Sequence, residues 1–159
     1  RDHVPWAAWV RDGRATATPG ACVDYDLVHR HIIADCEKHK VRLVGYDPWN
    51  AESTRKHIED DHGIPCVKVR QTYAVLTEPC RELERVVMSG AIDTASCPIL
   101  EWMADNVQVR TDDNGNMRPV KPDHHSSKKI DGIVALLIAI HVHIANAPEP
   151  SSIGNVHYV

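Results

Sequence analysis

The chain has 159 residues, of which 43% are hydrophobic and 25% are charged, as is typical of one folded domain and not of a disordered segment. The net charge is −4, from 22 acidic and 18 basic residues, so any binding to a nucleic acid needs a local basic patch or bound cations. No apolar run reaches the roughly 20 residues of a membrane span, and the N-terminus lacks a signal-peptide pattern, so we expect no membrane contact.

The first elements in chain order are a short strand over residues 6–10 and a helix capped by Asp24 or Asp26. Apolar runs and periodic segments predict the rest: a strand over 41–46, a polar helix over 51–61 stopped by Gly63, a strand over 64–69, a helix over 77–88 with Thr77 as its N-cap, a helix over 98–106, a hairpin of strands over 107–111 and 117–120, and an apolar helix over 130–145 that lies against the sheet. Alternating strands and helices with one hairpin predict an α/β domain with a mixed sheet. Since we find no linker, we expect one domain over residues 1–147 and a flexible tail over 148–159.

Asp47 and Asp131 are the two carboxylates that the pattern places beside the core. Asp47 follows the strand over 41–46, and open α/β sheets bind ligands beyond the carboxyl ends of their strands. Asp131 stands where a polar loop enters the last helix. Carboxylates suit Mg²⁺ or Mn²⁺, and two such ions can activate a water and stabilise the leaving oxygen of a phosphodiester. The alternative is that Asp47 only forms a turn and Asp131 only caps a helix.

Basic side chains flank Asp131 in the sequence, namely Arg118, Lys121, Lys128 and Lys129. They suit a polyanion such as DNA, although an ordinary solvated loop has the same composition. His124 and His125 in this loop either touch phosphate or are simply solvated, and Asp112 and Asp113 either approach the site or only form the hairpin turn. The five cysteines and eleven histidines lack the ligand spacing of a zinc site, which leaves a zinc-binding module as the weakest hypothesis.

Five segments, taken together, resemble the C-terminal half of the large terminase subunits of tailed phages. They occur in one order: Tyr46-Asp47-Pro48-Trp49-Asn50, Cys80-Arg81-Glu82-Leu83-Glu84, Pro98-Ile99-Leu100-Glu101-Trp102-Met103-Ala104-Asp105-Asn106-Val107, Asp112-Asp113-Asn114-Gly115-Asn116 and Lys129-Ile130-Asp131-Gly132. The resemblance extends from Val4 to Ala145. Each segment alone is weakly specific, whereas five in register are specific.

The resemblance implies an RNase H-like mixed sheet flanked by helices. It also implies a metal-dependent endonuclease that cuts concatemeric viral DNA into genome lengths, with Asp47 and Asp131 as the residues that hold Mg²⁺ or Mn²⁺. The implied partners are double-stranded DNA, the terminase ATPase domain, the small terminase subunit and the portal, and the implied location is the host cytoplasm.

The chain departs from that family in three respects. The family's first catalytic aspartate lies on the first strand of the sheet, and we expect this chain to begin after it, because neither Asp2 nor Asp12 ends an apolar strand. No phosphate loop of an ATPase is present. Asp93 and Cys97 stand where the family often has His and Asn. An alternative is therefore a truncated, catalytically inactive terminase fragment that binds DNA or packaging partners without cutting.

Overall fold

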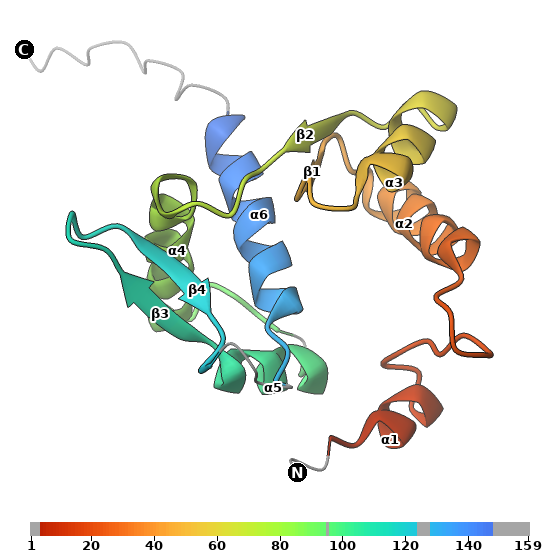
Figure 1. Cartoon of the computed structure of the whole chain (residues 1–159), viewed down its shortest axis with the longest axis horizontal. Coiled ribbons are helices and arrows are strands. Elements are labelled where there is room, and N and C mark those ends of the chain that lie inside the picture. Colours follow the sequence, from red (N-terminus) through yellow and green to blue (C-terminus); the bar gives the residue numbers. More distant parts are fainter. Residues whose placement is uncertain (1–3, 95, 124–127, 148–159) are drawn as a thin grey trace, which may run out of the picture.

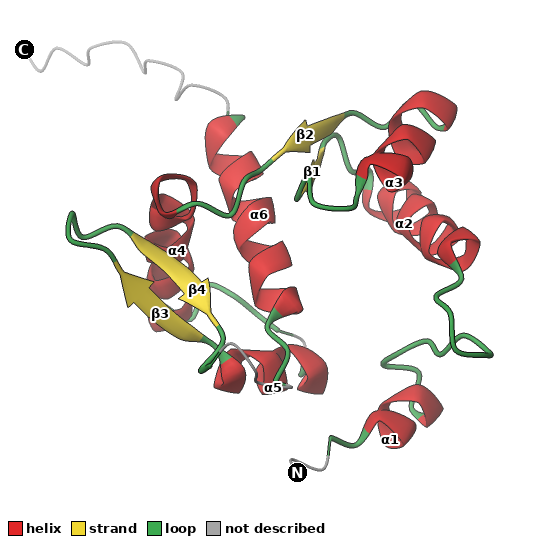
Figure 2. Ribbon diagram, viewed as in Figure 1, coloured by secondary structure: helices red, strands yellow, loops and turns green. Residues whose placement is uncertain are grey.

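The computed structural model describes residues 4–94, 96–123 and 128–147, and shows helices packed around two small sheets (Figure 1; Figure 2). In chain order the elements are α1 (Trp6–Arg11), α2 (Tyr25–His39), β1 (Val44–Tyr46), α3 (Glu52–Lys56), a π-helical turn η1 (His57–Asp61), β2 (Cys66–Lys68), α4 (Tyr73–Met88), α5 (Pro98–Asn106), β3 (Gln108–Thr111), β4 (Met117–Val120) and α6 (Asp131–Ala145). The predicted α/β class is confirmed. The predicted tail over 148–159 lies outside the described residues, as do His124 and His125.

The two sheets differ in strand direction. β1 and β2 run parallel, with Val44 opposite Cys66 and Tyr46 opposite Lys68, and the Val69 amide extends the ladder by donating to the Tyr46 carbonyl. β3 and β4 form the antiparallel hairpin that the sequence predicts. Its turn takes positive φ at Gly115, which a residue without a Cβ adopts at low cost. In the described part of the chain the parallel and antiparallel strands therefore form separate pairs.

Helix α6 forms the centre of the core, between the β1–β2 pair and α4 (Figure 1). One cluster joins Ile138 and Val142 of α6 to Val69 after β2. A second cluster joins Ile133 and Leu137 of α6 to Leu76 of α4, with partly buried residues of α5 around it. The last helix thus contacts the parallel sheet as expected, but its most extensive contacts are with α4. None of the described helices is long and apolar enough to cross a membrane.

The predicted strand over 6–10 is wrong, since these residues form helix α1. Trp6 and Trp9 are three residues apart, so a helix places both on one face, where they pack against Trp102 of α5 with ring centroids 5.6 and 5.8 Å away. An extended strand would point these two rings to opposite sides. The aromatic contact with a distant helix therefore decides the local structure.

The predicted N-cap Thr77 is also wrong, because α4 begins one turn earlier. The Thr72 side chain accepts a hydrogen bond from the Val75 amide, which caps the helix at its true start. Because the helix starts at Tyr73, the Leu76 side chain points into the core, where it is only 1% exposed. Pro79, which favours a first turn, consequently lies inside the helix.

Candidate functional site

Asp47 lies directly after β1, where the parallel pair ends. Its Oδ1 accepts the Trp49 amide at 3.0 Å, so the carboxylate helps to form the turn at Pro48. Its Oδ2 accepts a hydrogen bond from the side-chain amide of Gln71, a residue just past the end of β2. Asp47 therefore does form a turn, as the alternative interpretation predicts. Its second carboxylate oxygen, however, is bound by the side chain of Gln71, which follows the neighbouring strand.

Gln71 is a polar neighbour of Asp47 that the sequence analysis did not single out. The signal for it is the same one that selected Asp47, because the carboxyl ends of adjacent parallel strands meet at one edge of a sheet. Val69 pairs with Tyr46, which places Gln71 two residues beyond the ladder on the same edge as Asp47. The register of the two three-residue strands places Gln71 beside Asp47, and the sequence does not show this register.

Asp131 is the first residue of α6 and is exposed. The N-cap position belongs to Ile130, and no side chain caps this helix end, so Asp131 does not close the helix by accepting a backbone amide. The Gly132 amide donates to Met103 Sδ at 3.0 Å, which ties the start of α6 to α5. Asp131 is therefore held at a defined place beside the core with a carboxylate that the described residues leave without a hydrogen bond.

The relation between Asp47 and Asp131 follows from how β1 crosses α6. Gly45, two residues before Asp47, lies against Ile138 and Val142. Ile138 is seven residues after Asp131, which is about 10 Å along a helix axis. The strand that precedes Asp47 therefore packs on the helix that Asp131 begins, about two turns or more from its start. Across the described residues no group of three or more His, Cys, Asp or Glu side chains is placed to hold a metal ion.

The predicted basic residues divide between two places. Arg118 and Lys121 lie on β4 and just after it, where they line one concavity. Lys129 precedes α6, and its carbonyl accepts a hydrogen bond from the buried side chain of Asn106 at 3.1 Å. Lys128 lies beside Lys129, while residues 124–127 between the two places lie outside the described residues. The chain thus carries positive charge on both sides of that segment.

Asp112 is accounted for by the hairpin turn. Its carboxylate accepts the amides of Asn114 and Asn116 at 2.9 and 2.8 Å and the side-chain amide of Asn116 at 3.0 Å. The hydrogen bond from the Asn116 side chain, followed by those from the two backbone amides, lowers the pKa of Asp112. Asp113 is exposed in the same turn.

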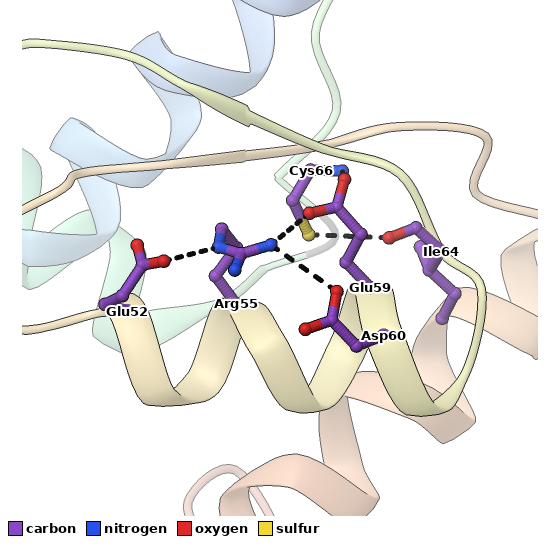
Figure 3. A network of polar contacts seen from close by, with 6 residues as sticks. All are labelled: Glu52, Arg55, Glu59, Asp60, Ile64 and Cys66. Carbon is purple, nitrogen blue, oxygen red and sulfur yellow. Dashed lines mark hydrogen bonds and ion pairs between the residues drawn. The ribbon is translucent and has the colours of Figure 1, made fainter.

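A polar network joins the start of β2 to α3 and η1 (Figure 3). Arg55 binds Glu52, with 3.0 Å between Nε and Oε1, and also the carboxylate of Glu59. Glu59 in turn accepts the Cys66 amide of β2 at 3.2 Å. The hydrogen bond from the Cys66 amide and then that from Arg55 lower the pKa of Glu59, although partial burial opposes the change. By fixing the start of β2, this network helps to set where Gln71 meets Asp47.

Comparison with known proteins supplies the family. Residues 1–147 match the family described as "Terminase large subunit, endonuclease domain". The chain is 34% identical over 133 residues to Protein YmfN of Escherichia coli (strain K12), covering 83% of this chain and 29% of that protein. It is 28% identical over 140 residues to the large terminase subunit of Enterobacteria phage HK97, covering 87% of this chain and 27% of that protein.

The fold agrees with these matches. The crystal structure of the HK97 bacteriophage large terminase superimposes with a TM-score of 0.78 at 28% identity, over 89% of this chain and 29% of that one. The chain therefore spans less than a third of the length of these relatives. From the match over residues 1–147 and the shared fold, the chain belongs to the family of terminase large subunit endonuclease domains.

Proposed function

We propose that this chain is a divalent-metal-dependent endonuclease domain that cuts concatemeric DNA into genome lengths during viral DNA packaging. The observation that carries the proposal is the match of residues 1–147 to the terminase endonuclease domain. Asp47 and Asp131, which the chemistry of the sequence selects independently, lie at the ends of two elements that pack on each other.

The residues present fit a hard divalent cation in donor type. Asp47 and Asp131 would hold Mg²⁺ or Mn²⁺, since both supply carboxylate oxygens. When bound, such an ion supplies positive charge that stabilises the phosphodiester as its bond to the leaving oxygen breaks. The amide of Gln71 fixes the carboxylate of Asp47, and the exposed Asp131 carboxylate stays available as an acceptor.

The remaining residues would serve substrate binding. Arg118, Lys121, Lys128 and Lys129 would bind the backbone of double-stranded DNA, which is read without regard to base sequence because phosphates carry no sequence information. The proposed partners are the terminase ATPase domain, the small subunit and the portal, in the host cytoplasm.

The test is plasmid cleavage by the chain with Mn²⁺, Mg²⁺ or EDTA. We expect cutting with either metal and none with EDTA. Asp47→Asn and Asp131→Asn should each reduce cutting to the EDTA level while circular dichroism stays native. Asp26→Asn is the matched control, since it removes one exposed carboxylate from α2 and should cut as the parent does. Full cutting by Asp131→Asn would show that the metal site lies elsewhere.

Gln71→Leu tests the positioning of Asp47. Removal of the amide should raise the Mn²⁺ concentration for half-maximal cutting by about 10- to 100-fold, the usual effect of removing a group that orients a metal ligand. An unchanged Mn²⁺ dependence would remove Gln71 from the site.

One observation favours a second candidate, a domain that binds DNA or packaging partners without cutting. Two carboxylates are few ligands, and the described residues include no larger metal-holding group. Retention of duplex DNA without cleavage under every metal condition would support this alternative over the nuclease.

A further inference from the structure

The β3–β4 hairpin places two arginines directly opposite each other. Arg110 on β3 pairs in register with Arg118 on β4. Residues opposite each other in an antiparallel pair project from the same face, with Cβ atoms about 5 Å apart, and like charges in this position are destabilising. The register thus places side by side two cations that repel each other.

Neither arginine is neutralised by an acid within the described residues. Arg110 is exposed and forms no ion pair there. Arg118 is instead held by an aromatic ring, with Cζ 4.7 Å from the centroid of Tyr73 at the start of α4. Its Nε is buried and has no hydrogen-bond acceptor among the described residues. A buried donor without a partner is costly, so the guanidinium of Arg118 is not fully compensated by the described residues.

These side chains line a concavity of about 350 Å³ at the end of the hairpin. Its lining consists of Arg110, Arg118, Val120, Lys121, Pro122 and Asp123. Three cations against one carboxylate leave the lining positive, even though the whole chain has a net charge of −4. The chain therefore concentrates positive charge where the fold has also left a donor unsatisfied.

We propose that Arg110, Arg118 and Lys121 form a binding site for one phosphodiester group of the backbone of duplex DNA. A guanidinium presents its N–H groups in a rigid fork that matches a phosphate, and Tyr73 holds the fork of Arg118 in place. A phosphate seated between Arg110 and Arg118 would offset their repulsion and accept from their guanidinium N–H groups. The choice of DNA rests on the proposed function, whereas the anion site rests on the hairpin alone.

Binding of the anion is tested first with inorganic phosphate. Titration of the ¹⁵N-labelled chain, followed through the arginine Nε–H resonances, should shift the Arg118 signal saturably. Sodium chloride at matched ionic strength should shift it little. Equal shifts with both salts would mean that the signal reports only general screening of charge, and would overturn the proposal. Polyglutamate, a polyanion without phosphate, is the second control. If it saturates the Arg118 signal at the same concentration as phosphate does, the proposal is likewise overturned.

Binding of DNA is tested with a fluorescent duplex in EDTA, so that no cleavage is needed. Arg110→Gln, Arg118→Lys and Lys121→Gln should each bind more weakly, and Arg110→Gln by about tenfold, since a charged hydrogen bond contributes on that order. The slope of log K against log salt should fall by about 0.9 for each phosphate that a variant no longer neutralises. Arg30→Gln, which removes an exposed arginine from α2, is the matched control and should keep the parent affinity and slope.

A stability measurement separates binding from a structural role. Because Arg110 faces a like charge, Arg110→Gln should raise the Tm at low salt while it weakens DNA binding. A lower Tm with unchanged binding would show that the pair is structural and would overturn the proposal. If the chain cuts DNA in a metal-dependent way but none of the three variants affects binding, this inference fails alone. If the chain never cuts but the three variants weaken binding, the nuclease proposal fails and this site stands.

Discussion

At the scale of single residues, Gly45 shows how closely the parallel strands lie on α6. A Cβ built at this position would lie 2.6 Å from Ile138 Cγ2 and 2.7 Å from Val142 Cγ2, far inside ordinary van der Waals distance. Both neighbours are β-branched side chains in a helix, where they have little rotamer freedom. The absence of a side chain at Gly45 is therefore what allows β1, and the Asp47 that follows it, to approach the helix that Asp131 begins.

Gly45→Ala should consequently lower the free energy of unfolding by about 1–3 kcal/mol, the range for added volume in a packed core. Urea unfolding followed by circular dichroism measures it. Gly132→Ala is the control, because its new Cβ would meet Met103 Sδ, which lies in a flexible side chain and can move aside. Equal destabilisation in both variants would contradict this role of Gly45.

At the scale of elements, Thr77 attaches the hairpin to α4. Its hydroxyl donates to the Tyr73 carbonyl at 2.7 Å and accepts the Met117 amide at 2.8 Å, so it links the first turn of α4 to the first residue of β4. Thr77 is 8% exposed, so water cannot replace these hydrogen bonds at low cost. The position of Arg118, one residue further along β4, depends on this link.

Thr77→Val keeps the shape of the side chain but leaves the partly buried Met117 amide without its acceptor. We expect it to cost about 1–3 kcal/mol of unfolding free energy. Hydrogen exchange at Met117 should speed up in this variant more than exchange in the β1–β2 pair. Thr77→Ser retains the hydroxyl and should protect the Met117 amide as the parent does, so rapid exchange in both variants would argue against this hydrogen bond.

At the scale of the whole molecule, stability should depend on acid through the carboxylates that accept hydrogen bonds. The pKa values of Glu59, Glu82 and Asp112 are all lowered, for Glu59 chiefly by the Cys66 amide and for Glu82 chiefly by Arg85. A carboxyl whose pKa is lower in the folded state stabilises the fold above its ordinary pKa. This contribution is lost as the pH falls through the lowered folded value.

Unfolding free energy should therefore be constant near neutral pH and fall below about pH 4, where carboxyl groups of ordinary pKa begin to bind protons. Urea titrations from pH 7 to pH 2.5 measure this dependence. Glu59→Gln should be less stable at pH 7 and should lose less stability on acidification than the parent. A parallel decline in the two proteins would mean that Glu59 does not contribute to the acid response.

Most of the elements could be predicted from the sequence, because local signals mark them. Asp24 caps α2 through the Leu27 amide, Pro98 opens α5, and the Asn-Gly turn closes the hairpin, all as expected from the chain alone. The two failures, α1 and the start of α4, both occur where a distant contact overrides a local preference. Packing against Trp102 favours a helix in the first segment. Burial of Leu76 in the core extends α4 toward its N-terminus, so that Pro79 lies inside the helix.

The sequence by itself determined the family resemblance that the comparisons confirm, and it indicated the candidate residues: two acids beside apolar elements and a basic segment before the last helix. Only the tertiary structure decided which groups meet. Gln71 reaches Asp47 because two short strands pair in one register, and Arg110 faces Arg118 because the hairpin pairs in another. The physical reason is that strand register and helix crossing are set by side-chain packing between segments far apart in the chain, which no local pattern of residues encodes.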